Sequence, residues 1–271
     1  MAESGLLTVR DLGAALGEVT VLDVRWRLGS SDGREQYLAG HVPGASYVDL
    51  ERDLADPPGP AGRHPLPDPE RFAAAMRRCG VRLARPVVVL DDWSGMAATR
   101  AWWLLRDHGH RDVRVLDGGW AAWLAEDGRA ETGEPLVEPG DLRADPGHLP
   151  VVDAEGASRL ARDGVLVDAR APERFRGEVE PVDPVAGHVP GAVNVPATAN
   201  VADGRFRPPG ELAEVYAATT GAAEVGVYCG SGVTATHDAF ALHLLGREAV
   251  LYAGSWSHWV TDPARPVATG A

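Results

Sequence analysis

The chain contains an internal repeat, and this repeat constrains its fold more than any other feature. Four blocks of sequence occur twice, in the same order, along the 271 residues. The first copies cover residues 19–28, 40–48, 86–105 and 113–123, and the second copies cover 164–175, 187–195, 224–245 and 249–259. Because the spacing of the copies is far longer than the about 20 to 50 residues of a solenoid repeat, the pattern predicts a duplicated domain.

Each copy alternates short runs of valine and leucine with segments of helical character, such as 68–81 and 99–110. This alternation is typical of an open α/β fold, with a mostly parallel sheet flanked by helices. We therefore predict an N-terminal domain over residues 1–133 and a C-terminal domain over residues 151–271. Residues 134–150 are rich in proline, glycine and charge, which indicates a linker.

One loop of the second copy contains a candidate nucleophile. Cys229 directly follows the apolar run that ends at Tyr228, and a glycine-broken stretch then leads into a predicted helix. In open α/β sheets, ligands bind beyond the carboxyl ends of the strands. When Gly232 is matched with Gly95 of the first copy, Cys229 falls opposite Asp92. We expect both side chains to face solvent or a cleft, and only the second copy to supply a nucleophile.

The residues after Cys229 are suited to stabilising an anion. Gly230 and Gly232 are expected to let the loop curl so that its N–H groups point inward, while Ser231 and Thr234 add hydroxyl donors. Such a loop at a helix N-terminus favours the thiolate form of cysteine. It suits either a bound oxyanion or a sulfur anion carried by the cysteine.

Two observations limit which cysteine can react and which reaction it can catalyse. Cys79 lies on an amphipathic pattern, where we expect it to pack as a small buried apolar residue. A cysteine phosphatase needs an arginine six positions after its nucleophile to clamp phosphate, and here that position is Ala235. Sulfur transfer does not need that arginine, so it is favoured over phosphatase chemistry.

Composition limits the partners. The formal net charge of −13 argues against nucleic acid and anionic membranes, and the sequence has no apolar run of about 18 residues that would predict a membrane span. Two cysteines in different contexts do not form a disulfide framework, so a cytoplasmic location is expected. The chain has no lysine, so any anion site must use arginine and backbone N–H groups.

The segments CGSGVTA (229–235), DARAPERF (168–175) and GSW (254–256), together with the paired GHVPGA blocks, resemble the two-domain sulfurtransferases of the rhodanese family. This family includes thiosulfate sulfurtransferases and 3-mercaptopyruvate sulfurtransferases. The resemblance implies tandem rhodanese-like domains, with an inactive N-terminal copy and a catalytic C-terminal copy. It also implies that Cys229 takes sulfur from a donor as a persulfide and passes it to a thiophilic acceptor, such as cyanide or a thiol.

We expect no cofactor and no metal. A thiol reductant such as thioredoxin is a candidate partner. The alternative from a different class is a non-enzymatic persulfide carrier or binding module, in which Cys229 holds sulfur but has no donor site of its own.

The resemblance also assigns roles within the site. Gly230-Ser231 matches the mercaptopyruvate subtype, since thiosulfate-type members carry basic residues there. In that subtype Ser231 belongs to a Ser-His-Asp set completed from the N-terminal domain, which implies roles for His64 of HPLP and for Glu51. Mercaptopyruvate is therefore the favoured donor.

Donor binding is implied for Arg174 and for the loop residues Gly230, Gly232, Val233 and Thr234. A second arginine that is usual in the subtype is replaced by Val182. Arg170 is expected to form a structural ion pair with Asp168. The recurring residues His41 and His188 are expected to support turns.

Overall fold

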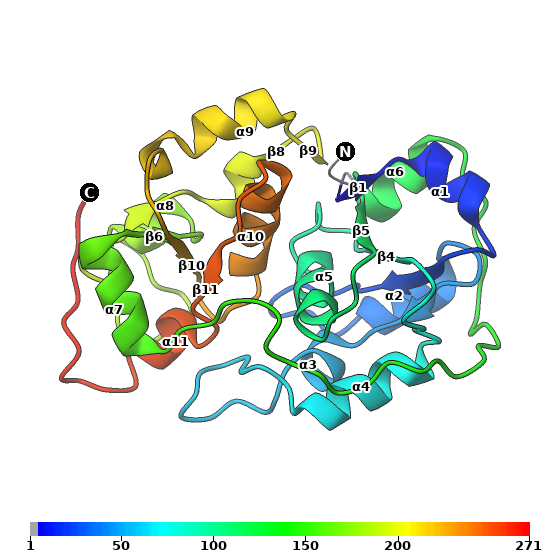
Figure 1. The fold of residues 1–271 in the computed structure, drawn as a ribbon, viewed down its shortest axis with the longest axis horizontal. Coiled ribbons are helices and arrows are strands. Elements are labelled where there is room, and N and C mark those ends of the chain that lie inside the picture. Colours follow the sequence, from blue (N-terminus) through cyan, green and yellow to red (C-terminus); the bar gives the residue numbers. More distant parts are fainter. Residues whose placement is uncertain (1–4) are drawn as a thin grey trace. The chain divides into compact units, whose positions relative to one another are not determined.

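The structure, a computed structural model, describes residues 5–271, so the first four residues of the predicted N-terminal domain lie outside the described residues. The described chain forms two compact units, each built on a parallel sheet with helices (Figure 1). The first unit contains residues 5–56, 67–148 and 203–206, and the second contains residues 57–66, 149–202 and 207–271. This arrangement confirms the predicted α/β fold class, while the predicted domain limits stay a prediction.

The first unit has a five-stranded parallel sheet in the order β1-β5-β4-β2-β3. Its strands are β1 (Leu6–Leu7), β2 (Thr20–Asp23), β3 (Ser46–Tyr47), β4 (Val87–Leu90) and β5 (Val113–Leu116). Its helices are α1 (Val9–Ala15), α2 (Gly33–Ala39), α3 (Leu50–Asp53), α4 (Pro69–Arg78), α5 (Ala98–Asp107) and α6 (Gly119–Ala125). β2 and β4 are buried at every position, as expected for strands covered on both faces.

The second unit repeats this plan with a four-stranded parallel sheet in the order β11-β10-β6-β7. The strands of this sheet are β6 (Val165–Asp168), β7 (Val193–Asn194), β10 (Val225–Tyr228) and β11 (Val250–Leu251). The short strand β8 (Val201–Ala202) lies in the second unit outside this sheet, and β9 (Arg205–Phe206) falls in the segment assigned to the first unit. The helices of the second unit are α7 (Ala154–Asp163), α8 (Pro172–Phe175), η1 (Ala197–Asn200), α9 (Pro209–Val215), η2 (Ala217–Thr219), α10 (Ala235–Leu244) and α11 (Ser255–Trp259). In both units the strand that precedes the loop of interest lies inside the sheet, between two neighbours.

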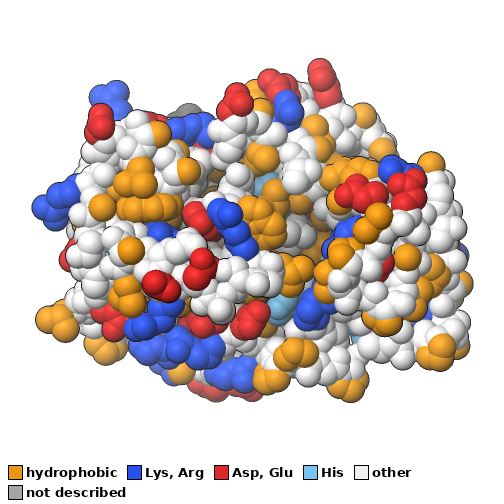
Figure 2. All heavy atoms as spheres, turned by 180° about the vertical axis from the view of Figure 1, so that it is seen from behind, with side chains coloured by type: hydrophobic (Ala, Val, Ile, Leu, Met, Phe, Trp, Pro, Cys, Tyr) orange, Lys and Arg blue, Asp and Glu red, His pale blue; other side chains and the backbone are white. Residues whose placement is uncertain are grey.

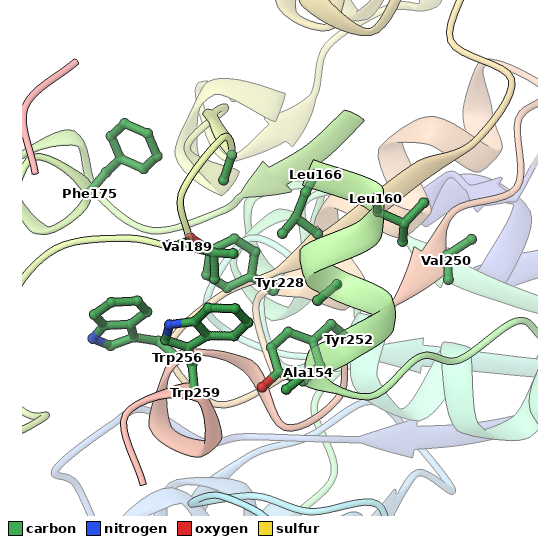
Figure 3. Close-up of a cluster of buried hydrophobic side chains, with 12 residues drawn as sticks. Ala154, Leu160, Leu166, Phe175, Val189, Tyr228, Val250, Tyr252, Trp256 and Trp259 are labelled. Atoms are coloured by element: carbon green, nitrogen blue, oxygen red, sulfur yellow. Dashed lines mark hydrogen bonds between the residues drawn. The ribbon is translucent and has the colours of Figure 1, made fainter. Parts of the chain in front are cut away.

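A cluster of buried apolar side chains holds the second unit together (Figure 3). Leu160 of α7 packs with Leu166 of β6, and Trp256 and Trp259 of α11 lie near Tyr228 at the end of β10. Burying one large apolar side chain stabilises a fold by about 1.5–3 kcal/mol. This cluster therefore fixes both the end of β10 and the start of α11, the two elements that flank the cysteine loop.

The surface adds little to this stability. Because the chain has no lysine, every side chain coloured dark blue in Figure 2 is an arginine, and acidic side chains lie close to arginines in several places. Such pairs in the structure include Arg176 with Glu178 and Arg207 with Glu211, each at 2.7 Å. Exposed pairs of this kind contribute only about 0–1 kcal/mol each. Within residues 5–271, no helix has both the length and the apolar character needed to cross a membrane.

A buried carboxyl group on α10 makes stability depend on pH. Asp238 is fully buried and accepts a hydrogen bond from Asn200 Nδ2 at 2.8 Å. Burial raises the pKa of Asp238 from its ordinary value of 3.8 to about 8. Between these two values the folded protein holds a proton that the unfolded chain releases, so stability falls as pH rises through this window.

We therefore expect Asp238→Asn to gain thermal stability relative to the wild type as pH rises from about 5 to about 8, because an amide cannot ionise. Melting curves of both proteins across this range measure the difference. Asp163→Asn, at an exposed position of α7, is the control and should follow the wild type. An unchanged difference between Asp238→Asn and the wild type across the range would contradict a buried neutral carboxyl at this position.

Candidate active site

Cys229 lies at the carboxyl end of β10, and α10 begins six residues later at Ala235. The cysteine is 2% exposed, and its Sγ accepts a hydrogen bond from the N–H of Gly232 at 3.1 Å. The side chain is therefore not exposed to solvent, and the prediction that it faces a cleft stays a prediction. The sulfur is buried within its own loop, where a backbone N–H group reaches it.

Hydrogen bonds from the start of α11 fix the loop. The N–H of Cys229 donates to Ser255 Oγ at 3.0 Å, and the N–H of Trp256 donates to the carbonyl oxygen of Cys229 at 2.9 Å. The N–H of Ser257 donates to the carbonyl oxygen of Gly230, also at 2.9 Å. Sequence reasoning gave Ser255 no role, although the GSW segment that contains it was one of the recurring blocks.

The two loop glycines are required for different reasons. Gly232 has a φ of 80°, and an added Cβ would lie 2.2 Å from the carbonyl oxygen of Ala253, so only glycine fits there. Gly230 does not have a left-handed φ, so the expectation that it allows the chain to curl is wrong. A Cβ at Gly230 would instead lie 3.1 Å from Arg63 Nη2 and 3.6 Å from Arg174 Nη1. Its missing side chain leaves space beneath two guanidinium groups.

Strand register corrects the match between the two loops. Tyr228 pairs with Asp168 in the second sheet, and Leu90 pairs with Asp23 in the first, so the residues that follow these strands are equivalent. Asp91, rather than Asp92, is thus the counterpart of the cysteine. Matching the glycines gave the wrong residue because the first loop is one residue longer before its glycine.

The Asp91 side chain shows what such a loop can bind. Its carboxylate is fully buried and accepts four backbone hydrogen bonds of 2.8–2.9 Å, from Trp93, Gly95, Ala97 and Ala98. The aspartate therefore fills an anion site made of N–H groups. Asp92, which the sequence match placed opposite Cys229, is instead partly exposed and pairs with Arg27 at 3.0 Å.

Several N–H groups of the second loop are open among the described residues, although the counterpart of Gly95, Gly232, donates to Cys229 Sγ. The N–H groups of Gly230, Ser231, Val233 and Thr234 donate to no acceptor among residues 5–271. Val233 itself is buried and Thr234 is half-buried just before α10. The loop thus offers N–H groups to an anion carried by Cys229, where the first copy uses its own aspartate.

A serine of this loop and a histidine from a distant segment of the chain lie within hydrogen-bond distance of each other. Ser231 Oγ and His64 Nδ1 lie 2.8 Å apart, and both side chains are buried. The segment 57–66, which carries His64, groups with the second unit, although its sequence position lies within the predicted N-terminal domain. The N–H of Arg63 donates to Ser257 Oγ at 3.0 Å, which anchors this segment on α11.

Glu51 lies in α3 of the first unit and is exposed. Its carboxylate accepts a hydrogen bond from Trp26 Nε1 at 3.3 Å. Its predicted role beside His64 stays a prediction.

Two buried carboxylates hold the arginine predicted to bind the donor. Arg174 donates from Nε and Nη2 to Glu180 at 3.2 and 2.6 Å, and Nη2 also lies 3.3 Å from Asp183. Although burial acts to raise the pKa of Glu180, hydrogen bonds from Arg174 and from the Val182 and Asp183 N–H groups lower it, so this carboxylate is ionised at neutral pH. Sequence reasoning missed both acids, although the acidic run 178–183 was a visible signal.

The predicted structural roles are confirmed. Arg170 Nη2 and Asp168 Oδ2 form a buried ion pair at 2.6 Å. His41 Nδ1 and His188 Nδ1 contact the backbone carbonyl oxygens of Tyr37 and Phe175 at 2.9 and 2.7 Å. Cys79 is buried at the end of α4, as expected.

Both units have the mostly parallel sheet with flanking helices that the resemblance implies for a rhodanese-like domain, and the cysteine loop follows a central strand of the second sheet. The family model for this domain matches residues 8–126 and 153–262, so the chain belongs to the rhodanese family.

Similarity to related proteins indicates which kind of rhodanese-family enzyme this is. The chain is 48% identical, over all of both chains, to a probable 3-mercaptopyruvate sulfurtransferase of Pseudomonas aeruginosa. It is 46% identical to a putative thiosulfate sulfurtransferase of Mycobacterium tuberculosis, over 98% of this chain and 97% of the other. The crystal structure of SseA from Escherichia coli, described as a 3-mercaptopyruvate sulfotransferase, matches with a TM-score of 0.84 and 33% identity, over 94% and 99% of the two chains. The protein is a sulfurtransferase enzyme, and the mercaptopyruvate subtype is favoured over the thiosulfate subtype.

Proposed function

We propose that the protein transfers sulfane sulfur from 3-mercaptopyruvate, through a persulfide on Cys229, to a thiophilic acceptor such as cyanide or a thiol. The observation that carries this proposal is the 2.8 Å contact between Ser231 and His64, two residues from a cysteine whose sulfur accepts a backbone N–H. A carrier that only holds sulfur does not need this pair, whereas breaking a bond beside a ketone does.

The first half-reaction balances as follows. The Cys229 thiolate attacks the donor's sulfur, and the S–S bond forms as the donor's C–S bond breaks. The bonding electrons move into the enolate of pyruvate, which takes up the proton of the new persulfide to give pyruvate. The N–H groups of the loop then hold the persulfide anion.

Ser231 has a distinct part in this step. Negative charge develops on the ketone oxygen as the C–S bond breaks, and a positioned hydroxyl donor stabilises that charge. His64 fixes the orientation of the hydroxyl through its Nδ1 contact, and Glu51 is proposed to support His64. In the second half-reaction cyanide or a thiolate attacks the outer sulfur, which regenerates the Cys229 thiolate.

Local charge favours the donor with one negative charge. Three guanidinium groups (Arg63, Arg170 and Arg174) are paired with three carboxylates (Asp168, Glu180 and Asp183) near the loop. This arrangement leaves no surplus positive charge for a dianion such as thiosulfate, and the chain has no lysine to add one. A monoanion with a ketone can use both an arginine and Ser231.

We therefore expect mercaptopyruvate to give a higher kcat/KM than thiosulfate when both donors are assayed side by side with cyanide as the acceptor. A higher value with thiosulfate would contradict the donor assignment. Such a result would leave the sulfurtransferase class unaffected.

The proposal also includes the role of the N-terminal copy, a candidate acceptor and the cellular location. The N-terminal copy is inactive because Asp91 replaces the nucleophile. A thiol reductant such as thioredoxin is a candidate acceptor, and a cytoplasmic location is proposed from the two unpaired cysteines.

A further inference from the structure

Two guanidinium groups approach the same point above the cysteine loop. An added Cβ at Gly230 would lie 3.1 Å from Arg63 Nη2, 3.6 Å from Arg174 Nη1 and 3.7 Å from Arg174 Nη2. Gly230 is the residue directly after Cys229. The space above this glycine is therefore next to the nucleophile and bordered by two cations.

Each arginine keeps one nitrogen available on this side. The Nε and Nη2 atoms of Arg174 bind Glu180, and Arg63 Nη1 binds Asp183 at 2.6 Å. Neither Arg174 Nη1 nor Arg63 Nη2 donates to any acceptor within residues 5–271. These two open nitrogens are the ones closest to the space above Gly230 on their respective side chains.

The geometry of Arg63 differs from that of an arginine held only for structure. A structural arginine commonly binds a carboxylate through two parallel hydrogen bonds. Arg63 instead contacts Asp183 through one nitrogen, and its Nε is buried without a hydrogen-bond partner among the described residues. Asp183 also reaches Arg174 at 3.3 Å, and its side chain is only 4% exposed. One buried carboxylate thus positions both cations.

Arg174 alone cannot bind a carboxylate bidentately, since Glu180 occupies its Nε–Nη2 edge and Asp183 accepts a further hydrogen bond from Nη2, which leaves only Nη1. A carboxylate above Gly230 could, however, take one N–H from each arginine. We propose that Arg63 is an anion-binding residue of this site, and that Arg63 Nη2 and Arg174 Nη1 together hold the carboxylate of the sulfur donor. Asp183 is the positioning residue for both. This inference rests on the proposed function for the identity of the donor.

Alkylation of Cys229 tests the inference without any sulfur donor. Iodoacetate carries a carboxylate beside the carbon that the thiolate attacks, whereas iodoacetamide is neutral, and both lose iodide. Rates at Cys229 are measured by peptide mass spectrometry. Arg63→Ala should slow the reaction with iodoacetate about 10-fold to 100-fold, as expected for the loss of one charge-assisted hydrogen bond, and leave iodoacetamide within about 2-fold.

Three further variants sharpen the test. Arg176→Ala removes an arginine that pairs with Glu178, and it should keep the wild-type preference between the two reagents. Arg63→Lys keeps the positive charge, so it should retain part of the preference and separates anion binding from a folding defect. Asp183→Asn keeps both cations but weakens their positioning, so a smaller loss than for Arg63→Ala is expected.

The outcomes are distinct. If Arg63→Ala leaves both alkylation rates unchanged, or lowers both equally, Arg63 does not bind the anion and the inference is overturned. With mercaptopyruvate, Arg63→Ala should raise KM much more than it lowers kcat. If the wild type fails to use mercaptopyruvate while Arg63→Ala still loses its preference for iodoacetate, the proposed donor is wrong and the anion-binding role of Arg63 stands.

Discussion

Replacing Cys229 by serine is expected to reduce sulfur transfer to the background rate with every donor. A serine hydroxyl is not ionised near neutral pH and cannot form a persulfide, so both half-reactions lose the atom that carries the sulfur. Steady-state assays with mercaptopyruvate and with thiosulfate, using cyanide as acceptor, measure the loss. The loop itself should persist, because its fixing hydrogen bonds come from backbone groups and Ser255.

Cys79→Ser is the matched control, since it removes the only other thiol. Cys79 is buried at the end of α4, and burial raises the pKa of its thiol to about 11, so it is protonated and unreactive at neutral pH. Its replacement should leave kcat near normal. Substantial transfer by Cys229→Ser, or loss of transfer by Cys79→Ser, would show that the nucleophile has been assigned to the wrong residue.

Ser231→Ala should lower kcat with mercaptopyruvate by about 10²-fold or more, the usual cost of losing one donor to a developing oxyanion. The serine is buried and bonded to His64, so its hydroxyl is already oriented before the donor binds. Thiosulfate has no ketone, and its slower reaction should change little. Comparison of kcat for the two donors measures this selectivity directly.

Two companion variants test whether Ser231 and His64 act as a unit. His64→Gln should lower kcat in the same direction, and the double variant should be little worse than Ser231→Ala alone. Ser158→Ala, on α7, is a control for serine removal and should behave as the wild type. Equal losses with both donors in Ser231→Ala would indicate a structural role for the hydroxyl.

The fold could be predicted from the sequence because the repeated blocks, the valine-rich strands and the helical segments can each be recognised from residues that are neighbours in the chain. A strand such as β10 and the loop after it are recognisable from Tyr228, Cys229 and the glycines that follow. The same local logic placed Arg170 and Asp168 together at the end of β6, two residues apart in the chain.

The site was less predictable wherever it depends on distant segments. The segment 57–66 brings Arg63 and His64 to a loop more than 160 residues later, and no periodic pattern records that contact. The one-residue difference between the two loops also hid the equivalence of Asp91 and Cys229, which only the strand pairing reveals. Likewise, the reason for Gly230 lies in the arginines above it and not in its own backbone.

The central claim is that Cys229 carries the sulfur taken from mercaptopyruvate, and mass spectrometry tests it most directly. The protein is incubated with mercaptopyruvate without an acceptor, and its peptides are then analysed under non-reducing conditions. We predict one added sulfur atom on the peptide that contains Cys229, with release of pyruvate, and loss of that sulfur when cyanide is added. An unmodified Cys229 peptide despite pyruvate release, or sulfur found on Cys79 instead, would contradict the mechanism.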